Sequence, residues 1–143
     1  MLRRHPLPRL WLMTDERQGE DLWTALERLP KGAGVVFRHY NLPRVDRRAL
    51  FERIRRVAQR RRLLLLAGGS GLRADGVHGG RHTRFSASVH SLGELKSAER
   101  SGAQLIFLSP AFVTRSHPGK RALGPGRLEP AALRAAGGAR DRL

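Results

Sequence analysis

The feature that most constrains the fold is an alternation of short apolar runs with stretches of helical periodicity. Continuous apolar runs occupy residues 10–13, 34–37, 63–66 and 105–108. Runs of this length, bounded by polar residues or glycine, are typical of buried strands. Strands that alternate with helices favour a parallel sheet, which is either doubly wound or closed as a barrel.

The segment after the first apolar run is predicted to form a helix. Leu22, Leu26 and Leu29 fall on one face at helical spacing, and Pro30 ends the pattern. Because this face is apolar, we expect the helix to pack against the sheet.

A second predicted helix begins near Asp46, whose side chain is expected to cap it. Its apolar stripe consists of Leu50, Ile54 and Val57. The opposite face is rich in arginine and holds Arg47, Arg48, Arg55 and Arg62. We therefore expect the stripe to face the sheet and the arginines to face solvent.

A third helix is predicted from Ser91, because Glu94 follows three residues later in the pattern of a capping box. Its apolar positions are Leu92, Leu95 and Ala98, and Gly102 lies near its end.

Residues 74–78 and 84–89 are predicted as two further short strands, separated by too few residues for full crossover helices. Six strands are therefore expected, within a single domain that spans residues 1–143. Residues 129–143 are expected to form a weakly structured or helical tail, because they contain no strand signal.

Polar groups follow the predicted strands at several separate places. Arg38, Asp75, His78 and His90 come at strand ends, and residues 109–120 form a loop rich in proline, glycine and hydroxyl groups. In parallel α/β folds the C-terminal ends of the strands share one face, and the chemistry is found there. We therefore expect these groups to line one pocket.

The charge is strongly basic, with a net value of +16 from 25 arginines and 3 lysines. Such a balance fits anionic partners, which include nucleic acids and phosphorylated metabolites. Nucleic acid is disfavoured, because only nine arginines cluster, in residues 44–62, and no aromatic side chains alternate with them. No apolar run is long enough to span a membrane. The lack of cysteine and of a signal-peptide pattern predicts a cytoplasmic location.

Four segments resemble motifs of the thiamine-phosphate synthase/TenI family. They are Leu-Trp-Leu-Met-Thr-Asp at 10–15, Ala-Asp-Gly-Val-His at 74–78, Ser-Val-His-Ser at 88–91 and Ser-Pro-Ala-Phe-Val-Thr-Arg-Ser-His-Pro-Gly at 109–119. The resemblance covers roughly residues 10–128. It implies an α/β fold of the TIM-type (β/α) barrel class that is incomplete, with about six strands visible and the last two strand–helix units absent. Either the chain is truncated, or the barrel is open and needs a partner to cover its edges.

The sequence departs from the family at the positions that hold pyrophosphate and Mg²⁺. The family's second strand usually ends in Gln-x-Arg-x-Lys, where this chain has Val36, Arg38 and Tyr40. The third strand usually ends in Asn-Asp, and the corresponding residues here are Ala67 and Gly68. Glycine also replaces the acidic residue expected after Val-His, and histidine replaces the usual lysine of the sixth loop.

The resemblance implies a protein of thiamine biosynthesis and leaves two reactions open. A synthase joins hydroxymethylpyrimidine pyrophosphate to thiazole phosphate and uses Mg²⁺. A TenI-type tautomerase moves a proton on a thiazole carboxylate phosphate without a cofactor, and its catalytic acid–base would be His90. The resemblance assigns substrate and phosphate binding to Arg38, Ser88, Thr114, Ser116, His117 and Lys120, and it places Asp75 and His78 in the pocket. The expected partner is a phosphorylated thiazole or pyrimidine, and the exposed strand edges predict a homodimer.

Two other classes of function stay open. The chain is alternatively a catalytically impaired family member that binds a phosphate ligand, or a basic protein that binds nucleic acid through its arginine-rich helix. Single residues also have structural explanations: Arg38 pairs with a carboxylate, His78 packs beneath the pocket, and His90 bonds within a strand end. Zinc on the histidines is disfavoured, because no close ligand pair falls on one helix, and no metal site is predicted.

Overall fold

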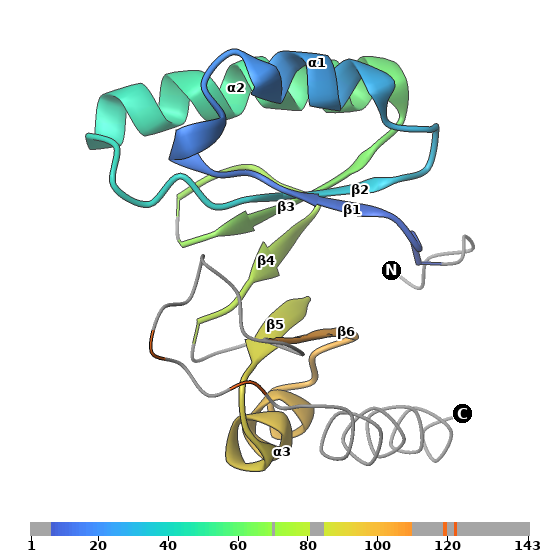
Figure 1. Cartoon of the computed structure of the whole chain (residues 1–143), viewed down its shortest axis with the longest axis vertical. Coiled ribbons are helices and arrows are strands. Elements are labelled where there is room, and N and C mark those ends of the chain that lie inside the picture. The colour runs from blue at the N-terminus through green and yellow to red at the C-terminus, as the bar shows by residue number, and fades with distance from the viewer. Residues whose placement is uncertain (1–6, 70, 81–84, 110–118, 120–121, 123–143) are drawn as a thin grey trace. The chain divides into compact units, whose positions relative to one another are not determined.

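The computed structural model describes residues 7–69, 71–80, 85–109, 119 and 122. The chain forms two compact units, Met1–His78 and Gly79–Leu143. Six strands and three α-helices lie within the described residues (Figure 1). The predicted number of strands is therefore confirmed.

The first unit contains four strands, β1 (Trp11–Met13), β2 (Gly34–Phe37), β3 (Leu64–Gly68) and β4 (Gly76–His78). Each pairs in parallel with the next one along the chain. β2 and β3 are buried at every residue, which explains their continuous apolar sequence. β1 is only half-buried, which corrects the expectation of a fully buried strand.

The connections of the first unit are a 3-10 turn, η1 (Glu16–Gln18), and two helices, α1 (Asp21–Arg28) and α2 (Arg44–Arg61). Figure 1 shows α1 and α2 side by side above the strands. Leu22 and Leu26 are buried, so the predicted apolar face of α1 is confirmed.

The core of the first unit lies between these helices and the strands. Its buried members include Leu22, Leu26, Val35, Phe37, Phe51, Ile54, Ala58, Leu65 and Ala67. The rings of Phe37 and Phe51 meet edge-on, with centroids 5.4 Å apart. Phe51 and Ala58 are buried beside Ile54, whereas Leu50 and Val57 are only partly buried, so the stripe predicted for α2 is confirmed at Ile54 alone.

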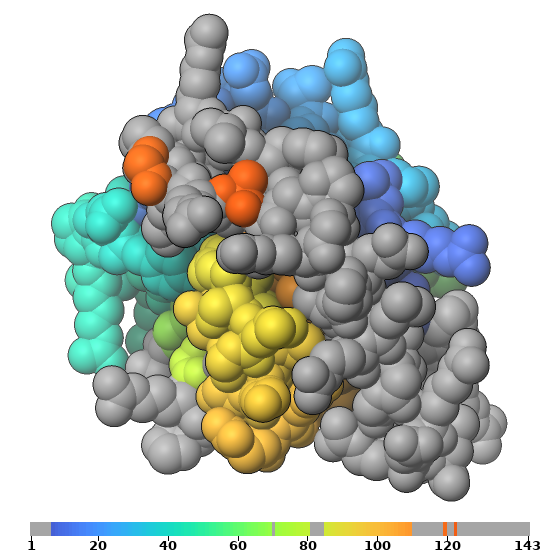
Figure 2. Space-filling model, turned by 60° about the horizontal axis from the view of Figure 1, so that its bottom comes forward, coloured from blue at the N-terminus to red at the C-terminus, as the bar shows by residue number. Residues whose placement is uncertain are grey.

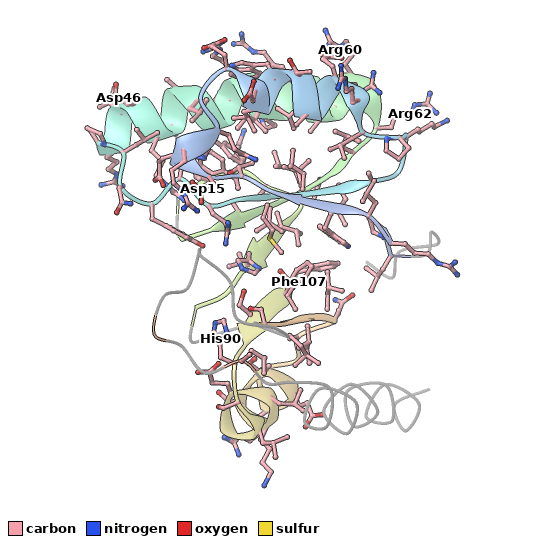
Figure 3. All side chains as sticks on the ribbon, in the orientation of Figure 1. Asp15, Asp46, Arg60, Arg62, His90 and Phe107 are labelled. Carbon is pink, nitrogen blue, oxygen red and sulfur yellow. The ribbon has the colours of Figure 1, made fainter. Side chains whose placement is uncertain are left out.

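The start of α2 differs from the prediction. The helix begins at Arg44, and Pro43 occupies the capping position with no side-chain cap. Asp46 lies in the first turn (Figure 3), so the prediction that Asp46 caps the helix is wrong. Proline has a fixed φ and lacks a backbone N–H, which suits it to the entry of a helix.

Gly34 is needed where β1 and β2 approach each other. A Cβ at this position would lie 2.5 Å from Cδ2 of Trp11, well inside van der Waals contact. The indole is held there because its Nε1–H donates to the carbonyl of Pro8 at 2.7 Å. The ring of Trp11 can therefore pack here only because residue 34 has no side chain.

Within its described residues, the second unit contains two parallel strands, β5 (Ser86–Val89) and β6 (Leu105–Leu108), and one helix, α3 (Leu92–Arg100). Its buried core consists of Ala87, Val89, Leu95 and Ala98. Figure 2 shows α3 at the surface of this unit, in yellow to orange. Leu92 is 53% exposed, so its assignment to the apolar stripe is wrong.

The predicted cap at the N-terminus of α3 is present, but the hydrogen bond accepted by the Glu94 side chain differs from that of a capping box. The Oγ of Ser91 accepts a hydrogen bond from the backbone N–H of Glu94 at 3.2 Å. The Oε2 of Glu94 accepts from the N–H of His90 at 2.7 Å, one residue before the capping position. Glu94 therefore ties the end of β5 to the start of α3.

Two predictions concern parts that the structure does not describe. Residues 129–143, expected to be a tail, lie outside the described residues, and a single domain over residues 1–143 stays a prediction. None of the helices in the described ranges combines the length and apolar character that crossing a bilayer requires.

Candidate functional site

Thr14 organises the C-terminal ends of β1 and β2. Its hydroxyl is buried, and its Oγ1 accepts a hydrogen bond from the N–H of Arg38 at 3.0 Å. The same Oγ1 lies 2.9 Å from Nδ1 of His39. When the hydroxyl proton is donated to His39, Nδ1 is the acceptor and the ring proton sits on Nε2. The threonine that closes the first strand thus orients a histidine at the end of the second.

Arg38 lies at the same edge. Its Nε–H donates to the carbonyl of Thr14 at 3.2 Å, and its Nη2 is 3.8 Å from Oδ2 of Asp15. Asp15 is held more closely by Arg17, at 2.8 and 2.9 Å, and these hydrogen bonds keep the pKa of Asp15 well below its ordinary value. The predicted ion pair of Arg38 with a carboxylate is therefore present, at a long N···O distance of 3.8 Å.

Two buried histidines face this edge in the neutral form. His39 and His78 are each 5% exposed. Burial lowers the pKa of His39. Burial, and after it the charge of Arg38, lowers the pKa of His78 to about 4. Both imidazole rings are uncharged at neutral pH, so the positive charge at these strand ends comes from arginine.

Arg47 turns from α2 onto the ends of β2 and β3. Its Nε–H donates to the carbonyl of His39 at 2.6 Å, and its Nη2–H donates to the carbonyl of Gly68 at 2.5 Å. Its guanidinium carbon lies 5.0 Å from the ring centre of Phe37 and 5.7 Å from that of Tyr40. The prediction that Arg47 faces solvent is therefore wrong.

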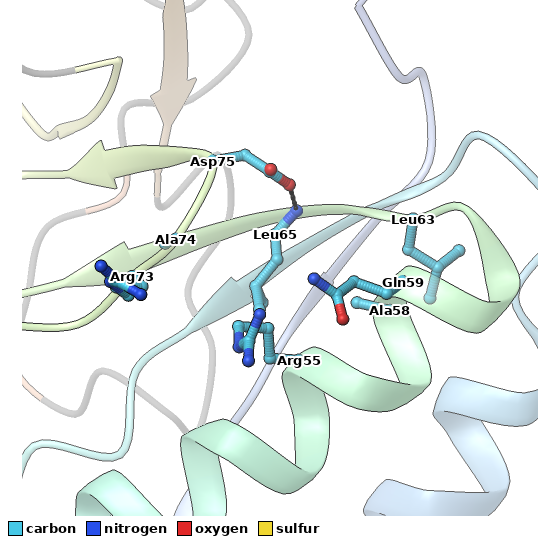
Figure 4. A pocket seen from close by; sticks show the side chains of 8 residues that line it. All are labelled: Arg55, Ala58, Gln59, Leu63, Leu65, Arg73, Ala74 and Asp75. Carbon is cyan, nitrogen blue, oxygen red and sulfur yellow. Dashed lines mark hydrogen bonds between the residues drawn. The ribbon is translucent and has the colours of Figure 1, made fainter.

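Asp75 lies near the N-terminal ends of β3 and β4, away from the C-terminal strand ends that carry Arg38. It precedes β4, where its Oδ2 accepts from the N–H of Leu65 at 2.8 Å and its N–H donates to the carbonyl of the same residue. The expectation that Asp75 follows a strand end is corrected. Beside it is a hollow of about 80 Å³ (Figure 4). This hollow is lined by Arg55, Ala58, Gln59, Leu63, Leu65, Arg73, Ala74 and Asp75.

His90 closes β5 in the second unit and lies at the start of α3 (Figure 3). Its Nδ1 is 2.5 Å from the carbonyl oxygen of Ser109. A carbonyl oxygen only accepts, so Nδ1 must carry the proton, and in the neutral ring the lone pair lies on Nε2. Ser109 follows β6, and the contact thus joins the ends of two neighbouring strands.

A hollow of about 300 Å³ opens beside this histidine. It is lined by Ser88, His90, Glu94 and Ser97. Two of the predicted site residues, Ser88 and His90, therefore share one concave surface with a carboxylate and a second hydroxyl. Such a surface combines a proton-transfer group with hydrogen-bonding groups for an anionic ligand.

The remaining predicted residues are distributed as follows. Arg38 and His78 share the strand-end region of the first unit, where the charge of Arg38 acts on the imidazole. Thr114, Ser116, His117 and Lys120 lie outside the described residues. A common pocket for all the predicted residues stays a prediction.

Sequence reasoning missed Thr14, His39 and Arg47. Thr14 ends the first apolar run and His39 follows Arg38 directly, so the clustering of polar groups at strand ends could have identified both. Arg47 has no such signal, because its spacing on α2 is that of a solvent-facing position.

Comparison with known proteins places these features in context. No protein-family model matches the sequence. The chain is 34% identical over 140 residues to "Putative thiamine-phosphate synthase 2" of Aquifex aeolicus, covering 82% of this chain and 75% of that protein. The fold is similar to the solved structure of thiamine phosphate pyrophosphorylase from Pyrococcus furiosus, with a TM-score of 0.71, 23% identity, and coverage of 89% of this chain and 70% of that one. This likeness confirms the predicted incomplete TIM-type (β/α) barrel, with six strands in the described residues.

Proposed function

Because the chain belongs to the thiamine-phosphate synthase/TenI family, we propose that it moves a proton on a thiazole carboxylate phosphate, with His90 as acid and base. The family relationship supports a role in thiamine biosynthesis. The observation that carries the choice of reaction is the hydrogen bond from Nδ1 of His90 to the Ser109 carbonyl.

This hydrogen bond suits His90 to both halves of a proton shift. With the proton on Nδ1, Nε2 of the neutral ring accepts a proton from one atom of the substrate. The imidazolium that results is stabilised by the Ser109 carbonyl dipole, its Nε2 proton exchanges with solvent, and Nε2 then delivers a proton to a second substrate atom. One proton leaves and one arrives, so the substrate is isomerised without a cofactor.

The neighbours of His90 support the same role. Glu94 accepts a hydrogen bond from the backbone N–H of His90, and it therefore holds the backbone that carries the ring. The hydroxyls of Ser88 and Ser97 lie in the same hollow and supply donors for an anionic substrate. Phosphate binding is proposed for Arg38, Ser88, Thr114, Ser116, His117 and Lys120.

A second candidate function is thiamine-phosphate synthesis, which the names of both similar proteins favour. This reaction requires the departure of pyrophosphate, and cations must stabilise the developing charge. The family generally uses Mg²⁺, whose chemistry when bound is the neutralisation of that charge. Arg38 follows β2 and matches the arginine that the family resemblance places there, and it would provide part of the charge stabilisation.

The proposal is tested by turnover with both sets of substrates. We expect isomerisation of thiazole carboxylate phosphate, and we expect His90→Gln to lower its kcat by about 10²–10⁴-fold, the usual contribution of a general acid–base. Lys96→Gln, an exposed change on α3, is the matched control and should keep full activity. Isomerisation at an unchanged rate in His90→Gln would exclude the mechanism. Turnover of only the pyrimidine and thiazole pair would identify a synthase, and turnover of neither would leave a phosphate-binding protein.

Two further proposals concern the whole protein. We propose self-association as a homodimer, because an open strand edge can pair with that of a second copy, and sedimentation velocity tests it. A cytoplasmic location fits a chain without cysteine, and cell fractionation tests it.

A further inference from the structure

Arg47 places a fixed positive charge at the ends of β2 and β3. It donates at 2.6 Å to the carbonyl of His39 and at 2.5 Å to that of Gly68, so it bridges the backbone at the ends of two adjacent strands. Stacking against Phe37 and Tyr40 further restricts the guanidinium. This charge is therefore part of the folded strand-end region.

The residues at these strand ends do not fit Mg²⁺. Such an ion needs an octahedral set of hard oxygen ligands, usually including carboxylates. In the described parts of the chain, no three histidine, aspartate or glutamate side chains form a group that could hold a metal. The carboxylate of Asp15 is already bound to Arg17. The carbonyl oxygens of His39 and Gly68 accept from a cation, which would repel a second cation.

Tyr40 occupies the space that a side chain at residue 68 would enter, so a carboxylate there would require the phenol to shift. A Cβ on Gly68 would lie 2.7 Å from Cζ of Tyr40, so the phenol occupies the space that a longer side chain needs. Tyr40 stands where the resemblance predicts lysine, and Gly68 where it predicts aspartate. These two departures from the family are linked, because the ring of Tyr40 packs against Gly68.

The electrostatic surroundings favour an anion. Burial raises the pKa of Tyr40, and the charges of Arg38 and Arg47 oppose that rise, so both guanidinium groups act on the same phenol. His39 and His78 are buried and neutral at pH 7, Asp15 is compensated by Arg17, and the carboxylate of Glu16, which also acts on His39, accepts from the N–H of Asn41. A guanidinium has five N–H donors, and Arg47 uses two of them for the strand-end carbonyls. Donors and positive charge therefore remain for a ligand.

We infer that the ends of β2 and β3 bind a phosphate-type anion directly on Arg38 and Arg47, without a divalent cation. The inference rests on the proposed function only in assigning phosphorylated ligands to this protein. It concerns binding in the first unit and does not depend on proton transfer by His90.

Calorimetric titration of the full chain with inorganic pyrophosphate tests this inference. One titration is done in EDTA and one in excess MgCl₂. We expect binding in EDTA, with an affinity at least equal to that in MgCl₂. Arg47→Gln should weaken the binding in EDTA by about tenfold or more, because charged hydrogen bonds to the anion are lost. Arg48→Gln removes the same charge from an exposed neighbouring position and should change the affinity by less than about twofold.

Several outcomes would overturn the inference. They are binding that requires Mg²⁺, no binding in either buffer, or an equal loss of affinity in Arg47→Gln and Arg48→Gln. If tryptophan fluorescence shows that Arg47→Gln is unfolded, Arg38→Gln is the second variant, and its affinity must also fall by about tenfold. Isomerisation by a protein that fails this titration would reject the inference and keep the proposed function. Binding in EDTA by a protein that does not isomerise the substrate would keep the inference and reject the proposed function.

Discussion

The buried histidine at the end of β4 should make the first unit less stable in mild acid. Burial lowers the pKa of His78 from 6.5 to about 4, with a smaller effect from Arg38. In the unfolded chain the imidazole takes up a proton near its ordinary pKa of 6.5, whereas the folded unit resists protonation until about pH 4. The stabilisation is therefore complete above the unfolded pKa and is lost as the pH falls toward the folded pKa.

The size of this effect follows from the two pKa values. Between pH 7 and pH 5 the unfolded state gains about 2 kcal/mol from proton uptake that the folded state does not share. The pKa of His39 is lowered as well, and protonation of this residue acts in the same direction. We therefore expect the free energy of unfolding to fall by about 2 kcal/mol or more over this range.

Urea titration followed by tryptophan fluorescence measures this change. Both tryptophans of the chain, Trp11 and Trp23, lie in the same unit as His78. In His78→Gln the loss of stability between pH 7 and pH 5 should be smaller by about 2 kcal/mol than in the unmodified protein. Lys96→Gln, an exposed change in the other unit, is the control. A pH dependence that is the same with and without His78 would refute the reasoning.

Two further variants test the packing described above. Gly34→Ala should lower the free energy of unfolding by about 1–3 kcal/mol, because the new methyl group overlaps the ring of Trp11; urea titration by tryptophan fluorescence measures this, and an unchanged midpoint would contradict the contact. Ser91→Ala should destabilise α3 by about 1 kcal/mol through loss of the hydrogen bond to the N–H of Glu94; hydrogen exchange of the α3 amides measures this, and unchanged protection would show that the cap contributes nothing.

Much of the fold could be predicted from the sequence, because the apolar runs and the helical stripes are strong local signals. The strand at residues 105–108 and the cap at Ser91 are both present. The sequence predicts that α2 starts near Asp46 because aspartate is a good capping residue, whereas in the structure Pro43 sets the entry through its backbone. Leu92 is exposed because a residue in the first turn of a helix can lie beyond the surface that the stripe covers.

The candidate site was less predictable, because side chains there act over long sequence separations. The tautomer of His90 is fixed by the carbonyl of Ser109, 19 residues away, and a backbone group leaves no trace in the sequence. Arg47 reaches the carbonyl of Gly68, 21 residues away, from a helical position that resembles its exposed neighbours. Motif resemblance identifies His90 and Arg38, but only the folded chain shows which groups they contact.

The proton transfer assigned to His90 is tested most directly by the isomerisation of thiazole carboxylate phosphate in D₂O, followed by NMR. The unmodified protein should form a product that carries one deuterium from solvent, and His90→Gln should form almost none in the same time. Deuterated product at the same rate in His90→Gln would contradict the assignment.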